Sequence, residues 1–260
     1  MQDKRDFTST IYISRRLLEL GQFSFSPAFL ANLLEISPRR ASILAGQMAA
    51  DGLAAEVEKG KYLLLGLEPE QVLSNPLFIA SQLVVPCYVS YWSALHFHGL
   101  TTQVPQTVFC ATTRRKRPVD FQGQTFRYVS VRPHKFFGYR RERLADLPIL
   151  VADEAKTIID GLDQPRYAGG LPEVAQALHA ALDTLDLDLL AEYARRMDDY
   201  SLAARLGYLL ELFGRPAPDL PASRSPVALD PARPRRGRLN ARWRSVINVS
   251  PAELNLPGIG

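Results

Sequence analysis

The chain has 260 residues, of which 47% are hydrophobic, and this is enough apolar material for two modest folded domains and excludes disorder throughout. Its formal net charge of +4 is unevenly spread: residues 111–143 hold 10 basic and 2 acidic side chains, whereas residues 144–213 hold 5 and 13. No Asp, Glu, Lys or Arg occurs from Gln71 to Cys110. We expect this uncharged stretch to be core, and its prolines and polar residues argue against a membrane span.

The first 68 residues predict three helices. Helical periodicity runs over 11–20 and stops at Gly21. Ser26 and Ser37 are each followed by proline, and an N-cap serine with a first-turn proline predicts helices over 27–34 and 38–50. Strand-like alternation on both sides of residues 59–60 then predicts a hairpin. Three helices and a hairpin are typical of a winged helix-turn-helix.

The third of these helices is the predicted reader of a DNA major groove. Arg39 and Arg40 lie at the N-terminus of this helix. Positive side chains there oppose the helix dipole, so we expect these two arginines to serve a ligand and not stability. The alternative is a protein-interaction module, because residues 1–70 hold 8 basic and 9 acidic side chains. The predicted DNA contacts are Arg39, Arg40, Ser42 and Gln47 on the helix and Lys59 and Lys61 at the hairpin tip.

We interpret residues 69–85 as a connector with a turn at 75–76, and residues 86–214 as a second domain. A short helix is expected over 90–99, capped by Ser90 or Ser93 and ended by Gly99. Strands are expected over 106–112, 126–131 and 148–152. From Asp153 onward the pattern becomes helical. The fold class is therefore α+β, with a helical C-terminal half.

Residues 215–260 are predicted to form a Pro- and Arg-rich tail. Its first part, 215–234, has the composition of a tether with little regular structure. Strand-like alternation resumes near the end, so this part is expected to dock back on the second domain.

A second basic segment follows the strand predicted over 106–112. Arg114, Arg115, Lys116 and Arg117 are consecutive and could contact phosphates as an auxiliary clamp. The alternative is that the acidic helices of 144–213 neutralise them.

Four residues have the side chains of a zinc site. Cys87, His96, His98 and Cys110 could ligate zinc, but the histidines are two positions apart on a predicted helix and project about 200° apart, which argues against one ion. Two cysteines also provide no disulfide framework and favour a reducing, cytoplasmic setting. We expect no metal and no cofactor.

A metal-dependent nuclease or nucleic-acid-modifying enzyme using Asp146, Glu154 and Lys156 is the alternative function. That chemistry needs the side chains presented together around a divalent ion, whereas Glu154 and Lys156 here open a helix. A helix-capping role explains Asp153 and Glu154 without catalysis. We therefore expect no enzymatic activity.

Several segments in this order resemble the AbiEi family of antitoxins, transcriptional regulators from type IV toxin-antitoxin systems. YVSYWSALHFHGL followed by QTVFCATTRRKR resembles the start of that family's antitoxin domain, and LDPARPRRGRLNARWRSVINV resembles its closing motif. VADEAKTIIDGLDQPRYAGGLPEVAQAL is similar to its central segment, which contains Lys156, Thr157, Asp160, Pro165, Gly169 and Gly170.

The resemblance implies a cytoplasmic autorepressor that binds inverted repeats in its own promoter through the winged helix. It also implies an antitoxin in an abortive-infection (phage defence) system, which counteracts a nucleotidyltransferase-like toxin without binding it stably. Double-stranded DNA is thus the expected physical partner, and the toxin a functional one.

Overall fold

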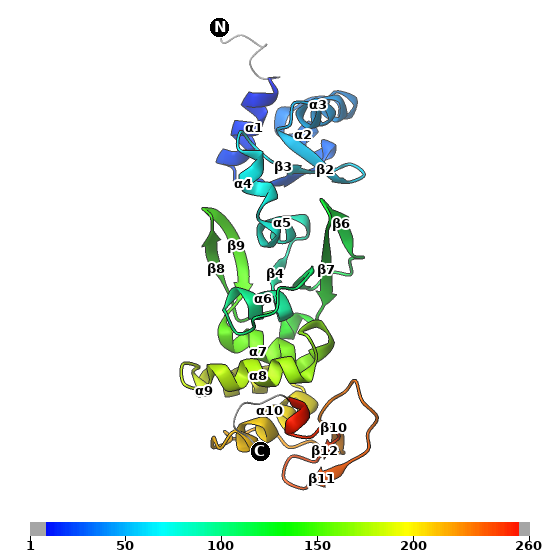
Figure 1. Cartoon of the computed structure of the whole chain (residues 1–260). Helices are drawn as coiled ribbons and strands as arrows, with labels where there is room; N and C mark the ends of the chain where they lie inside the picture. The colour runs from blue at the N-terminus through cyan, green and yellow to red at the C-terminus, as the bar shows by residue number, and fades with distance from the viewer. Residues whose placement is uncertain (1–8, 255–260) are drawn as a thin grey trace.

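Two hydrophobic cores organise residues 9–254, which are the part of the chain that this computed structural model describes (Figure 1). The smaller core lies at the N-terminal end and includes Ile13, Leu30, Leu44 and Met48. The larger core extends from Leu63 to Leu254 in the C-terminal tail. In Figure 1 the chain descends from the N-terminal elements through a sheet to the C-terminal helices and tail.

The N-terminal elements are three helices and a small antiparallel sheet in the strand order β1-β3-β2. Their bounds are α1 (Thr10–Glu19), β1 (Ser24–Phe25), α2 (Pro27–Leu34), α3 (Pro38–Ala50), β2 (Ala54–Glu58) and β3 (Lys61–Leu64). The predicted caps are confirmed: Ser26 Oγ accepts a hydrogen bond from Phe29 N at 3.2 Å, and Ser37 Oγ accepts one from Arg40 N at 3.4 Å. The expected helices and hairpin are therefore present.

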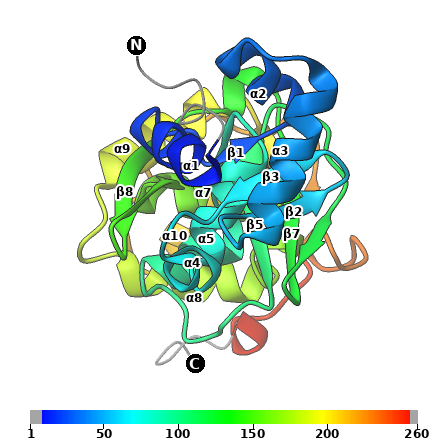
Figure 2. The ribbon, with the colours of Figure 1, turned by 90° about the horizontal axis from the view of Figure 1, so that it is seen from above.

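The segment that we interpreted as a connector is instead two helices, α4 (Pro69–Leu73) and α5 (Pro76–Leu83). Asn75 accepts a hydrogen bond from Phe78 N at 3.1 Å, so the Asn-Pro pair that we interpreted as a turn is an N-cap. Phe78 and Ile79 are buried in the larger core. Seen from above, the N-terminal elements lie over α5 and the sheet beneath it (Figure 2).

A six-stranded mixed sheet with the order β6-β7-β5-β4-β9-β8 forms the centre of the second unit. Its strands are β4 (Cys87–Val89), β5 (Thr107–Thr112), β6 (Val119–Phe121), β7 (Gln124–Ser130), β8 (Tyr139–Leu144) and β9 (Leu147–Ala152). Strand β5 pairs with β7 in parallel, with Thr107 opposite Thr125. The sequence did not indicate β4, β6 or β8 as strands.

Helices lie on both sides of this sheet. Helix α5 lies between the β8-β9 and β6-β7 hairpins, and α6 and α7 lie on the side away from the N-terminal elements (Figure 1). The α-helices of this half are α6 (Tyr91–Phe97), α7 (Glu154–Asp163), α8 (Leu171–Ala181), α9 (Leu187–Arg196) and α10 (Tyr200–Leu212). Its 3-10 turns within residues 9–254 are η2 (Pro133–Lys135), η3 (Pro165–Tyr167) and η4 (Ala252–Leu254). As predicted, Asp153 caps α7, accepting a hydrogen bond from Lys156 N at 2.7 Å.

A buried ion pair fixes α7 against the sheet. Lys156 and Asp160 are one turn apart on α7, bond to each other, and expose 0% and 1% of their side chains. Asp160 Oδ2 also accepts hydrogen bonds from Tyr88 OH at 3.0 Å and Ser90 Oγ at 2.7 Å. Ser90 does precede α6, but its hydroxyl goes to Asp160 and does not cap the helix.

The tail packs against α10. It forms a small sheet from β10 (Val227–Ala228), β11 (Arg238–Asn240) and β12 (Ser245–Ile247). Trp243 is buried against Gly207 of α10, and its Nε1 donates a hydrogen bond to Glu211 at 2.8 Å. The absence of a side chain at Gly207 is what lets the indole lie so close.

Removing one member of a buried ion pair leaves the other charged and uncompensated. We expect Asp160→Ala to lower the free energy of unfolding by about 3–5 kcal/mol, measured by chemical denaturation. The control Glu192→Ala removes an exposed carboxylate and should change it by less than about 0.5 kcal/mol. A decrease below about 1 kcal/mol for Asp160→Ala would show that the network does not support the core.

A methyl group on Gly207 would lie 2.5 Å from the Trp243 indole, closer than van der Waals contact allows. Gly207→Ala should therefore displace the tail, making residues 215–254 sensitive to limited proteolysis and shifting tryptophan fluorescence to the red. Gly46→Ala is the matched control, because no atom lies within 4 Å of the added methyl. Equal proteolysis of the two variants would contradict this packing.

Candidate nucleic-acid interface

Helix α3 presents the four predicted DNA contacts on one exposed face. Its opposite face is buried against α1 and α2 through Ala41, Leu44, Ala45 and Met48. The exposed residues are Arg39, Arg40, Ser42 and Gln47. Within residues 9–254, neither arginine forms an ion pair, so both guanidinium groups are available to a ligand.

Local hydrogen bonds set the geometry at the start of α3. The cap from Ser37 and the proline at the first helical position define where the helix begins. Ser42 Oγ donates to Pro38 O at 3.0 Å, which leaves its lone pairs as acceptors. The first turn is thus well ordered beneath the two arginines.

The hairpin lysines have different environments. Lys59 is exposed at the turn between β2 and β3. Lys61 points toward the second unit, where its ammonium donates to Leu83 O and lies 3.8 Å from Glu58. Burial lowers the pKa of Lys61, and the nearby cation of Lys116 lowers it further, whereas Glu58 raises it. Of the two lysines, only Lys59 is exposed at the surface without a partner among the described residues of the second unit, as a contact with DNA would require.

The basic segment 114–117 lies beside the hairpin, because the loop that carries it leads into β6, which contacts β2 (Figure 1). Lys116 forms an ion pair with Glu58 of β2. Arg114, Arg115 and Arg117 are exposed, and none of them has an ion-pair partner in the part of the chain described. The acidic helices therefore do not neutralise this segment. Their carboxylates pair elsewhere, as Glu211 of α10 does with Arg242.

The residues proposed for nuclease chemistry are not brought together. Asp146 precedes β9 and Glu154 follows it, and a strand of six residues is about 20 Å long. Lys156 is enclosed in the core, where its ammonium lies 4.5 Å from the centre of the Phe137 ring. No group of three potential metal ligands is found among the described residues, which include Cys87, His96, His98 and Cys110. The two cysteines are free and buried.

Glu154 has a structural partner. Its carboxylate forms a two-fold hydrogen bond with Arg140 of β8, at 2.9 and 3.1 Å, and lies 3.4 Å from His98 Nδ1. The bond from Arg140 is the main cause that lowers the pKa of Glu154, against burial, which raises it. Glu154 thus connects the sheet edge to the start of α7.

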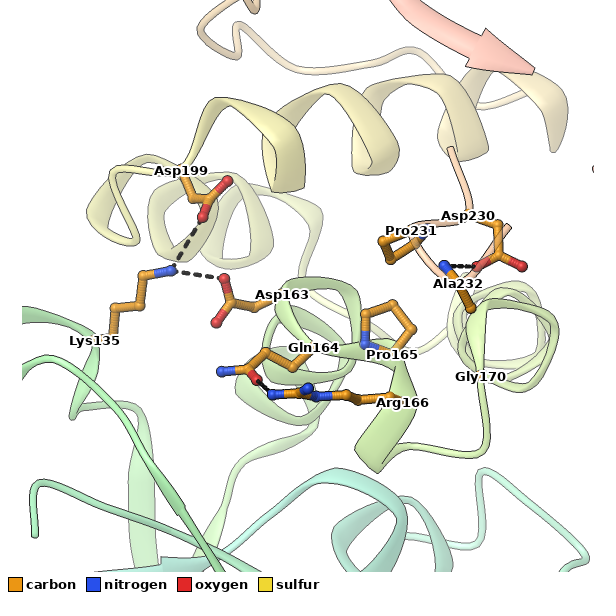
Figure 3. Close-up of a pocket in the computed structure, with 10 residues that line it drawn as sticks. All are labelled: Lys135, Asp163, Gln164, Pro165, Arg166, Gly170, Asp199, Asp230, Pro231 and Ala232. Carbon is orange, nitrogen blue, oxygen red and sulfur yellow. Dashed lines mark hydrogen bonds and ion pairs between the residues drawn. The ribbon is translucent and has the colours of Figure 1, made fainter. Parts of the chain in front are cut away.

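A cavity of about 580 Å³ lies at the end of α7 (Figure 3). Lys135 bridges Asp163 at 2.6 Å and Asp199 at 3.2 Å across one wall. Burial raises the pKa of Asp163, although Lys135 opposes the shift. Arg166 on the opposite side donates to Gln164 at 3.2 Å. Lys135, Asp163 and Asp199 are thus engaged with one another, whereas Arg166 contacts a neutral amide.

Sequence reasoning missed Glu58 and the buried role of Lys156 and Asp160. Nothing in the sequence relates Glu58 to Lys116, which is 58 residues away. The i,i+4 spacing of Lys156 and Asp160 was a usable signal, since oppositely charged side chains at this spacing meet on a helix.

Comparisons with known proteins provide a fold relationship only. No family model matches the chain, and no curated protein matches it. The crystal structure of the RV2827C protein from Mycobacterium tuberculosis is similar, with a TM-score of 0.53 and 12% sequence identity over 90% of this chain and 89% of that one. The similarity covers nearly the whole α+β fold. Among the described helices, none has the length and apolar character needed to cross a bilayer.

A carboxylate whose pKa is lowered on folding stabilises the fold above its unfolded pKa of about 4.3, and this contribution disappears as the pH falls through the folded value. We therefore expect Glu154→Gln to be less stable than the parent protein at pH 7, and this difference to shrink below about pH 4. Thermal unfolding across this pH range measures it. A pH-independent difference would mean that charge is not what Glu154 contributes.

Proposed function

We propose that this protein is a DNA-binding transcriptional repressor with an N-terminal winged helix-turn-helix. The observation that carries the proposal is the exposed face of α3, where Arg39 and Arg40 have no ion-pair partner within residues 9–254. Two such arginines at a helix N-terminus contribute little to folding but suit bidentate contacts with guanine or phosphate. Helix α3 would enter the major groove, and the β2-β3 hairpin would form the wing.

The wing carries Lys59 toward the DNA backbone, and Arg114, Arg115 and Arg117 add positive charge beside it. These groups explain how a region without net positive charge can bind a polyanion, because the charge is supplied jointly by two parts of the chain. In this arrangement Lys61 and Lys116 hold the wing in place, since both interact with groups across the junction.

We further propose that the protein is the antitoxin of a type IV toxin-antitoxin system in the cytoplasm. The ordered segments that resemble AbiEi proteins support this role. On this proposal it represses its own promoter at inverted repeats and counteracts a nucleotidyltransferase-like toxin without a stable complex. The separation of Asp146, Glu154 and Lys156 leaves the nuclease alternative without a supporting observation.

Arg39→Ala with Arg40→Ala should weaken binding to a DNA duplex from the protein's own promoter by about 1–3 kcal/mol per base-specific contact. Fluorescence anisotropy at several salt concentrations measures the effect. The slope of log K against log salt should also fall by about one for each phosphate that the variant no longer neutralises.

The matched control is Arg235→Ala with Arg236→Ala, an exposed adjacent pair in the tail with the same change in charge. The tail lies at the other end of the molecule from α3 (Figure 1), so this variant should bind as the parent does. If the two double variants bind equally well, α3 is not the reading helix.

A further inference from the structure

A cavity of about 360 Å³ lies at the junction between the N-terminal elements and the second unit. Its N-terminal side is formed by β1 and β3, and its other side by the end of α5 and the loop after β5. Its charged lining residues are all basic: Lys61, Arg114, Arg115 and Lys116. Gln22 and Gln82 add neutral amides.

Glu58 is a carboxylate that contacts two of these four cations. It pairs with Lys116 and lies 3.8 Å from Lys61. Arg114 and Arg115 have no ion-pair partner within residues 9–254. The cavity therefore carries an uncompensated positive charge drawn from two separate parts of the chain.

Like charges gathered in a concave, partly desolvated site repel one another more strongly than on an open surface. Burial is the largest cause that lowers the pKa of Lys61. The cations of Lys116 and Arg114 lower this pKa further, as such repulsion would. An anion in the cavity would relieve the repulsion and would contact both sides of the junction.

We propose that this junction cavity binds a phosphate group. Arginine forks and lysine ammonium groups together match the several oxygens and the double negative charge of a phosphate better than those of a carboxylate. The group could belong to the DNA backbone or to a free phosphorylated molecule, and both share the same recognition chemistry. Binding does not rest on the proposed repressor function, because a free anion can test it without DNA.

Inorganic pyrophosphate, titrated calorimetrically into the full chain at low ionic strength, is the probe. Arg115→Gln should weaken binding about tenfold, because it removes one charge-assisted hydrogen bond. Arg117→Gln is the control: it removes the same charge two residues along the same loop but does not line the cavity. This variant should stay within about twofold of the parent.

Two further variants keep the test independent of any one substitution. Arg114→Gln should weaken binding as Arg115→Gln does. Glu58→Gln removes the carboxylate that competes with the anion for these cations, so it should tighten binding severalfold. Absence of binding to the parent protein, or equal weakening by Arg115→Gln and Arg117→Gln, would overturn the proposal.

Adding pyrophosphate to a DNA titration identifies the source of the phosphate. Competition with DNA would assign the cavity to the backbone, and unchanged or tighter DNA binding would assign it to a free phosphorylated ligand. A protein that binds pyrophosphate as described but binds no DNA would refute the repressor proposal and leave the cavity assignment intact.

Discussion

The carboxylate of Asp160 is the group on which the larger core depends. It accepts hydrogen bonds from Tyr88 of β4 and from Ser90 at the start of α6, and it forms an ion pair with Lys156 of its own helix. A buried charge is tolerated only when its partners are all in place, because desolvation otherwise costs more than the attraction returns. This requirement fixes how α7 lies on the sheet. Helix α7 in turn contacts α6, α8, α9 and α10, so the C-terminal half takes its position from this network.

A second electrostatic interaction determines how the N-terminal elements meet that unit. Glu58 on β2 pairs with Lys116 from the loop after β5, and Lys61 on β3 donates to the backbone at the end of α5. Both interactions lie on the side of the hairpin that faces the second unit. Helix α3 takes no part in them, and its arginines stay accessible. The junction thus restrains the hairpin while leaving the α3 face open, as our repressor proposal requires.

Several residues of the segment 151–178 have structural roles in the fold. Lys156 and Asp160 form the buried pair, and Thr157 Oγ1 donates to Asp153 O at 2.8 Å at the start of α7. Gly169 has φ +80, and an added Cβ would lie 2.9 Å from the Glu173 side chain. A glycine is needed there to let the chain turn into α8. These residues therefore serve the packing of α7 and the turn into α8.

Much of the helical structure could be predicted from the sequence. Ser26, Ser37 and Asp153 marked helix starts because a cap bonds a backbone amide about three residues ahead, so the information is local. The strand-like alternation around Lys59 and Gly60 indicated the hairpin for the same reason. In contrast, β4, β6 and β8 were missed. Strands β4 and β6 have only three residues each, and β8 is a charged, largely exposed edge strand that is ordered by pairing with β9.

The sequence by itself determined the starts of α2, α3 and α7, the hairpin and the candidate arginines of α3, because these follow from neighbours within one turn of the chain. Only the tertiary structure decided that α5 packs into the larger core, that Lys156 is buried and not presented for chemistry, and that segment 114–117 faces the hairpin and not the acidic helices. These outcomes depend on which surfaces meet across long chain separations. Burial and Coulomb interactions between residues distant in the sequence select among these packing arrangements, and a local sequence pattern does not indicate which residues they are.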